Sequence, residues 1–259
     1  MFGVTSPGIL EEQGLGAASY KLAFNGSSAT TVNLGNSVSN DCRTVMFWLK
    51  LNSNVASDDT ILSRRTPGSN SGMFQLAFNA PNRIKAVLTQ NPITSYEFAI
   101  IDNSLILSEW YHITFRVDPV EGMRFFVNGV SASPNNPNYT DVILNTTIDT
   151  ILGGYDQASI RYTDADIKEP KFFTNSLTQE EIISEMTYHP TGLESGLKEY
   201  YDFSEGSGTS TTGVKGNVAT LTTATMWEET PYTDYNKITI NQNNDELISI
   251  QDTCVSGAK

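Results

Sequence analysis

The run Tyr111-His-Ile-Thr-Phe-Arg-Val117 alternates strictly between apolar and polar side chains, and it decides the fold class. Successive side chains of a β-strand point to opposite faces, so the apolar members share one face and the polar members the other. Turn formers follow in Asp118-Pro-Val-Glu-Gly122, and a second alternating run covers residues 123–128. The sequence therefore predicts a β-hairpin with one buried face.

Similar runs recur along the chain and are separated by turn-forming residues. Period-two patterns cover residues 20–25, 45–51, 73–79 and 83–89. Dipeptides that favour turns follow several of the runs, and they include Asn25-Gly26, Pro67-Gly68 and Asn128-Gly129. Many short strands joined by turns predict an all-β fold, here a two-sheet antiparallel jelly-roll sandwich.

One short helix is expected to interrupt the strands. The Thr178 side chain can accept a hydrogen bond from the N–H of Glu181, whose carboxylate can return one, and this pattern is a capping box. The helix is expected to end near His189-Pro190, because the residue before a proline disfavours helical geometry. The remaining expectations are a strand at 200–203, a long loop at 204–216 and a hairpin formed by 237–241 and 246–250.

Composition narrows the possible partners. The net charge of −13 describes an acidic surface that repels phosphate backbones, so nucleic acid is not expected to bind. No run approaches the roughly 18 apolar residues of a membrane helix, and the N-terminal residues lack the pattern of a Sec signal. The cysteines Cys42 and Cys254 could form a disulfide or stay free.

Four segments in a fixed order resemble a known family. They are Leu22-Ala-Phe-Asn-Gly-Ser27, Thr44-Val-Met-Phe-Trp-Leu-Lys50, Glu109-Trp-Tyr-His-Ile-Thr-Phe115 with Phe125-Phe-Val-Asn-Gly129, and Asp166-Ile-Lys-Glu-Pro-Lys-Phe172 with Leu177-Thr-Gln-Glu-Glu-Ile182. Over residues 20–190 this set is similar to the concanavalin A-like lectin/glucanase superfamily in its laminin-G-like form. The resemblance implies two antiparallel sheets packed face to face, and glycan or protein ligands, often with calcium. Members include lectins, adhesion modules, enzymes and virion proteins, so the fold alone does not fix the function.

Catalytic residues of the glucanase branch have no clear counterpart in this sequence. That branch carries acids spaced as Glu-x-Asp-x-x-Glu on one strand, and the nearest match is Asp164-Ala-Asp166-Ile-Lys-Glu169. Asp164 and Asp166 share a face of a regular strand, but Glu169 falls on the other face. We interpret His112 as a structural hydrogen-bonding residue and His189 as solvated, so no placed base is expected. The sequence predicts a protein that is not an enzyme.

The loop after residue 150 carries the candidate binding residues. Thr150-Ile-Leu-Gly-Gly-Tyr-Asp-Gln157 resembles the pentraxin loop that supplies calcium ligands, although it holds fewer acids. Candidate glycan-binding residues combine aromatic rings with nearby polar groups: Tyr155, Asp156, Gln157 and Tyr162. Candidate calcium ligands are Asp156, Asp164 and Asp166, because calcium takes oxygen ligands. Ordinary polar loops and surface aromatics remain the alternative, and Trp110 is interpreted as a core anchor.

Three functions follow from these features. The first is a structural or adhesive component on the surface of a large assembly such as a virion, with protein partners bound through the termini. The second is a calcium-assisted lectin or adhesin, and the third, disfavoured, is a glycan-active enzyme. The expected organisation is an N-terminal arm at 1–19, a jelly-roll domain at 20–228 and a β-rich tail at 229–259.

Overall fold

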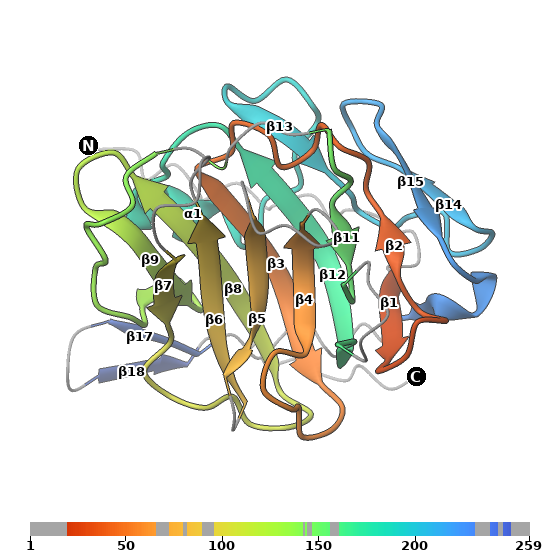
Figure 1. The fold of residues 1–259 in the computed structure, drawn as a ribbon, viewed down its shortest axis with the longest axis horizontal. Helices are drawn as coiled ribbons and strands as arrows, with labels where there is room; N and C mark the ends of the chain where they lie inside the picture. Colours follow the sequence, from red (N-terminus) through yellow and green to blue (C-terminus); the bar gives the residue numbers. More distant parts are fainter. Residues whose placement is uncertain are drawn as a thin grey trace, which may run out of the picture.

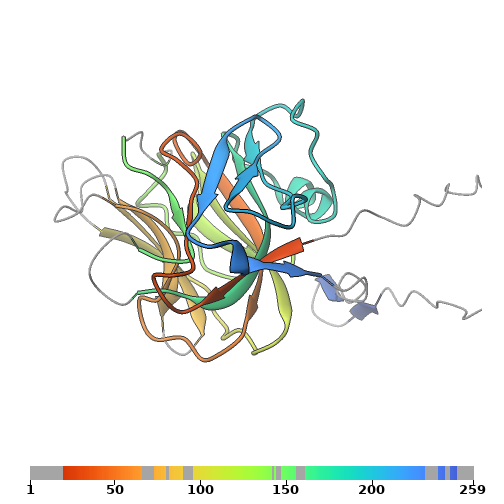
Figure 2. The same ribbon diagram turned by 90° about the vertical axis from the view of Figure 1, so that its right-hand side faces the viewer.

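The chain folds into two antiparallel sheets packed face to face (Figure 1). The computed structural model describes residues 20–65, 73–79, 82–89, 96–141, 143, 147–155, 161–230, 239–242 and 246–249. Each sheet has eight strands, and a two-stranded hairpin stands apart from them. Figure 2 shows the sheets edge-on, with the helix α1 on the outer side of one of them. The predicted all-β jelly-roll sandwich with one short helix is confirmed.

The first sheet, sheet A, contains the hairpin predicted from residues 111–128. Its central strand β12 is flanked by β3 on one side and by β1 on the other, and β13 pairs with its second half. The strands of sheet A are β10 (Val130–Ser131), β9 (Gly122–Val127), β8 (Trp110–Asp118), β3 (Thr44–Leu51), β12 (Asp164–Phe173), β1 (Tyr20–Asn25), β16 (Trp227–Glu229) and β13 (Leu197–Tyr200).

The second sheet, sheet B, joins early strands to late ones. Its middle strand β11 lies between β2 and β4, so the paired residues Ile151 and Asn33 are 118 positions apart, and Ile151 and Ser63 are 88 apart. The strands of sheet B are β14 (Ser210–Thr212), β15 (Val218–Leu221), β2 (Val32–Asn33), β11 (Ile151–Leu152), β4 (Thr60–Arg64), β5 (Phe74–Asn79), β6 (Arg83–Thr89) and β7 (Tyr96–Ile100).

The main core fills the space between the sheets. Ile113, Phe115 and Val117 of β8 face inward with Phe125 of β9, as their alternation predicts. The Phe115 ring packs on Phe125 and on Phe74 from sheet B, with centroid distances of 5.3 Å and 5.9 Å. The sandwich is therefore joined across its two sheets by apolar side chains.

Helix α1 (Gln179–Glu185) covers part of the outer face of sheet A. Thr178 and Glu181 form the predicted capping box, and Ile182 packs into a second apolar cluster with Met46 and Phe126. The helix ends at Met186, before the expected His189-Pro190. The buried Lys171 ammonium gives the reason, because it rises from β12 and donates to the carbonyls of Glu185 and Tyr188.

Several local predictions need correction. The predicted strand at 200–203 is shifted to β13, and Phe203 takes a positive φ of 58° that no regular strand has. The expected loop at 204–216 contains β14, which pairs with β15. The C-terminal hairpin is confirmed as β17 (Thr239–Gln242) with β18 (Glu246–Ser249). Cys42 is a free, buried thiol, and Cys254 lies outside the described residues.

No helix in the described ranges is long and apolar enough to cross a bilayer. The predicted domain limit at 228 falls inside β16, which pairs with β1. The predicted arm at 1–19 lies outside the residues that the structure describes.

Candidate functional site

The candidate glycan-binding tyrosines gather where β11 ends. The chain turns at Gly153 and Gly154, and Gly153 exchanges backbone hydrogen bonds with Ile61 and Thr163, at 2.7 Å and 3.2 Å. The Tyr162 ring lies so close to Gly154 that a Cβ there would come within 2.4 Å of the ring. Gly154 therefore lets the ring approach the backbone closely, and Tyr162 itself is half-buried.

Tyr155 follows the same turn but is mostly covered. Only 7% of its surface is exposed, and the guanidinium of Arg65 lies 4.9 Å from its ring centroid. Ser63 donates a hydrogen bond of 2.9 Å to the carbonyl oxygen of Gly154, which ties the turn to β4. The structure thus brings Tyr155 and Tyr162 to the Gly153–Gly154 turn, with Tyr162 beside the start of β4 and Tyr155 under Arg65, which follows the end of β4. Asp156 and Gln157 lie outside the described residues, so their part in the site stays a prediction.

Asp164 and Asp166 lie on the outer face of sheet A. Asp166 is 2% exposed, and its carboxylate pairs with the ammonium groups of Lys21 and Lys50, the latter at 2.9 Å. Asn52 donates a further hydrogen bond of 3.0 Å to Asp166. Burial raises the pKa of Asp166, but these hydrogen bonds outweigh it and hold the pKa below its usual value.

These contacts concern the two roles considered for Asp164 and Asp166, catalysis and calcium binding. Ser53 donates a hydrogen bond of 2.6 Å to Asp164, and two lysines neutralise Asp166. In the part of the chain that the structure describes, no three acids, histidines or cysteines come close enough to hold a metal ion. Calcium binding by Asp156 stays a prediction. The Asp166 carboxylate already pairs with two lysine ammonium groups. Beyond Asp166 the strand bulges at Glu169, which has a φ of 54°, so the expected face of Glu169 does not apply.

A row of aromatic and cationic side chains crosses the same face. Trp110, predicted as a core anchor, faces outward and is half-buried, with the ammonium groups of Lys168 and Lys50 at 4.5 Å and 5.2 Å from its ring. Trp48 lies beside it and meets the His112 ring edge-on at 5.1 Å. Burial lowers the pKa of His112 to about 3, which fits its predicted structural role. Counting outward positions on each strand would have revealed this row.

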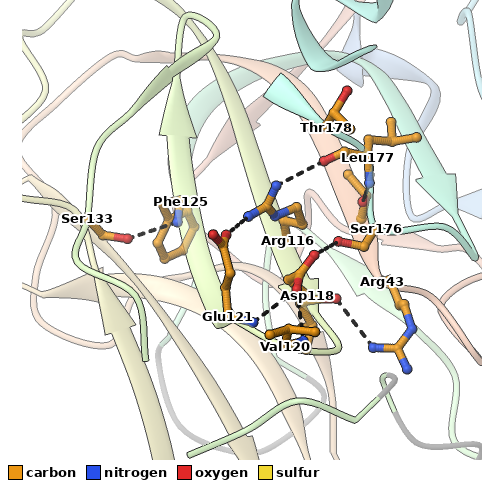
Figure 3. A network of polar contacts seen from close by, with 12 residues as sticks. Arg43, Arg116, Asp118, Val120, Glu121, Phe125, Ser133, Ser176, Leu177 and Thr178 are labelled. Carbon is orange, nitrogen blue, oxygen red and sulfur yellow. Dashed lines mark hydrogen bonds and ion pairs between the residues drawn. The ribbon is translucent and has the colours of Figure 1, made fainter. Parts of the chain in front are cut away.

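A polar network fastens the β8–β9 hairpin to the segment before α1 (Figure 3). Arg116 donates to the Leu177 carbonyl at 3.2 Å and to Glu121 at 2.6 Å. Asp118 accepts from the N–H groups of Val120 and Glu121, and from Ser176 at 2.9 Å. Every charged group of this network has a partner, so its evident task is to hold the hairpin and the helix together.

The fold is shared with carbohydrate-binding structures at low sequence identity. A Bacteroides ovatus protein assigned a carbohydrate-binding role matches with a TM-score of 0.57 and 14% identity, over 79% of this chain and 58% of that one. A CBM40 domain of a Ruminococcus gnavus sialidase, solved with α2,3-sialyllactose, matches with a TM-score of 0.50 and 13% identity, over 66% of this chain and 99% of that one. At such identities the likeness shows the fold alone.

Three further comparisons concern another solved structure, the curated proteins and a family model. Domain 4 of an extracellular arabinanase from Geobacillus stearothermophilus, solved with arabinotriose, matches with a TM-score of 0.50 and 16% identity, over 65% of this chain and 81% of that one. No curated protein matches the sequence. The family model described as the concanavalin A-like lectin/glucanases superfamily matches residues 24–183, which is more than half of the 259 residues. The chain belongs to this superfamily.

Proposed function

We propose that this chain is a non-catalytic, glycan-binding jelly-roll protein whose binding surface lies at the end of sheet B around the Gly153–Gly154 turn. The observation that carries the proposal is the gathering there of Tyr162, Tyr155 and Arg65. Saccharides stack on aromatic rings and hydrogen-bond to planar polar groups. The half-buried Tyr162 offers a ring, and the guanidinium of Arg65, over the mostly covered Tyr155 next to the same turn, offers a planar donor. Three proteins with this fold add support: a protein assigned a carbohydrate-binding role, an arabinanase domain solved with arabinotriose and a CBM40 domain solved with sialyllactose.

The state of the β12 acids supports binding without turnover. Glycoside hydrolysis needs two carboxyl groups that face one bond, one of them able to give a proton. Asp166 is held ionised between lysines, and Asp164 accepts a hydrogen bond from Ser53. A carboxylate with a lowered pKa is a poor proton donor, so this pair suits structure better than acid catalysis.

A glycan array with the purified chain tests the proposal. We expect binding to at least one glycan class, roughly fivefold weaker in Tyr162→Ala, because stacking on one ring contributes about 1 kcal/mol. Tyr188→Ala is the matched control, since Tyr188 is a more exposed tyrosine on a different loop, where it donates to Glu194. Equal binding by the wild type and Tyr162→Ala would move the site elsewhere, and no binding to any glycan would refute the proposal.

A calcium-assisted lectin remains the second candidate, because Asp156 follows Tyr155 directly. Calcium wants six to eight oxygen ligands, so other oxygens from the same end of the sheet would have to join it. Calorimetric titration with calcium, and glycan binding before and after a chelator, distinguish the two mechanisms. Binding that survives the chelator supports the calcium-free site, and binding that is abolished supports the lectin alternative.

We further propose the setting expected from the sequence, a surface component of a larger assembly such as a virion. The described part of the C-terminal tail supports it, since β17 and β18 form a β-hairpin near β10, a short strand at the edge of sheet A. Edge strands and hairpins are common means of joining chains. Light scattering on the full chain and on a chain ending at residue 230 tests this, and two monomers of unchanged shape would contradict it.

A further inference from the structure

The β8–β9 hairpin places two arginines directly opposite each other on the outer face of sheet A. Arg116 of β8 is in register with Arg124 of β9, while the adjacent pairs on the hairpin face the main core. Directly opposite residues of antiparallel strands have Cβ atoms about 5 Å apart, so like charges at these positions repel each other. The pair therefore lowers stability unless negative charges lie beside it, and Glu121 supplies one to Arg116.

The two arginines differ in their partners. Arg116 pairs with Glu121, donates to the Leu177 carbonyl and lies 5.1 Å from the ring centroid of Phe126. Across the described part of the chain, Arg124 has no side-chain hydrogen bond and no ion pair. Of its three guanidinium nitrogens only Nε is buried without a partner, so the two terminal nitrogens face solvent. Arg124 is thus a half-buried cation whose solvent-facing nitrogens have no hydrogen-bond or ion-pair partner among the described residues.

An unused acceptor lies on the segment opposite Arg124. Asn136 exchanges two backbone hydrogen bonds of 2.9 Å with Met123, and the Ala132 N–H donates to Phe125. The three residues between Ala132 and Asn136 therefore run opposite Arg124. One of them, Asn135, has a buried Oδ1 with no partner. Because this oxygen is buried, a ligand from solution does not reach it, and the exposed nitrogens of Arg124 are the groups open to one.

The chain as a whole is acidic, which makes the lack of an acid near Arg124 informative. Acids outnumber lysines and arginines by 29 to 16, and yet none of the acids in the described ranges lies within 4.0 Å of Arg124. The planar guanidinium fork matches carboxylate and sulfate groups, and partial burial strengthens such a pair. The Arg116–Arg124 row is therefore suited to an anion from outside the chain.

We infer that Arg124, with Arg116 beside it, anchors the carboxylate or sulfate of an acidic saccharide. This inference rests on the proposed glycan-binding function and adds a charge preference to it. The proposed glycan-binding function favours a saccharide over an acidic peptide as the carrier of the negative group. Arg116 and Arg124 lie on sheet A, whereas Tyr162 lies beside sheet B. The proposed anion contact is therefore a second glycan contact, separate from the one at Tyr162.

Calorimetry on the full chain with three probes tests the inference. The probes are a heparin tetrasaccharide for sulfate, sialyllactose for carboxylate, and lactose as the neutral reference. We expect an acidic probe to bind roughly tenfold or more tightly than lactose, and Arg124→Gln to abolish that preference. Lys198→Gln removes the same charge from β13, where the Lys198 ammonium has no hydrogen bond or ion pair within the described structure, and it should keep the preference.

Thermal unfolding gives a second readout. Arg124→Gln should melt at the same temperature as the wild type or slightly higher, because it removes repulsion and breaks no hydrogen bond or ion pair within the described residues. Loss of acidic binding through misfolding would lower that temperature and would overturn the inference. Equal affinity of the wild type and Arg124→Gln for the acidic probes would also overturn it, as would tighter binding of a polyglutamate peptide. If lactose binds without any acidic preference, only this inference fails; if no saccharide binds at all, the proposed function fails with it.

Discussion

The inner and outer faces of β12 are almost equally buried, yet they are held by different means. Ile167 and Phe172 face the main core, where apolar side chains from both sheets surround them. Asp166 and Lys171 face outward, where each finds partners of opposite charge or exposed helix carbonyls. Apolar packing needs only a matching shape, whereas a buried charge needs one particular partner. The inner face should therefore tolerate small changes gradually, and the outer face should respond to the loss of single atoms.

The largest effect is expected on the inner face. Phe115→Ala removes a ring that joins the two sheets through Phe74 and Phe125, and it should lower the free energy of unfolding by about 4 kcal/mol. Urea denaturation measures this change. Val120→Ala serves as the control, because Val120 is 82% exposed and should lose nothing measurable. A loss below about 1 kcal/mol for Phe115→Ala would mean that the core closes around the gap.

The contrast between the two faces also explains which features of the structure could be predicted from the sequence. Alternation along β8 and β3 is a local pattern, and it correctly predicts which side chains enter the core. Partners on the outer face come from distant segments, as for Lys21 and Asp166, which are 145 positions apart. No local pattern encodes that pairing. For the same reason the end of α1 was predicted too late, since Lys171 reaches it from another strand.

The candidate site also contains residues that the sequence predicted and residues that it missed. Tyr155 and Tyr162 were predicted from residue type and loop position, and the structure brings them to one turn. Arg65 was missed, because it follows β4 and meets Tyr155 only after the sheet has formed. Trp110 was assigned to the core because an aromatic residue at a strand start suits either face.

The next largest effect is expected at Lys171. Lys171→Met keeps most of the side-chain volume but leaves the carbonyls of Glu185 and Tyr188 without their donor, and Glu185 without its ion pair. We expect a loss of about 3 kcal/mol in urea denaturation, with faster amide exchange at Ile182 and Met186. Lys198→Met is the control on the neighbouring strand. Unchanged exchange in the helix would show that Lys171 is not its cap.

A smaller effect with a clear pH dependence is expected at Asp166. Asp166→Asn leaves Lys21 and Lys50 without their shared carboxylate and should lower the free energy of unfolding by about 2 kcal/mol at neutral pH. Because the pKa of Asp166 is lowered in the folded state, its stabilisation is complete above the ordinary pKa of about 3.9 and is lost as the pH falls through the folded value. The gap between wild type and variant should therefore narrow below about pH 4, and a gap that is constant down to pH 2 would contradict the ion pair.

The smallest effect is expected at Glu194, outside both faces of β12. Burial opposes its ionisation, but the Thr191 N–H and the hydroxyls of Tyr188 and Thr191 outweigh it and lower the pKa to about 2. The stabilisation by this carboxylate is therefore present above about pH 4.5 and is lost as the pH falls toward 2. Because Glu194 is exposed to solvent, Glu194→Gln should leave the global unfolding midpoint unchanged and speed amide exchange only at Thr191 and Gly192. A shift of the global midpoint would mean that this loop unfolds together with the rest of the fold. A carboxylate bonded mainly to its own loop would then stabilise the protein as much as the buried Asp166 on sheet A does.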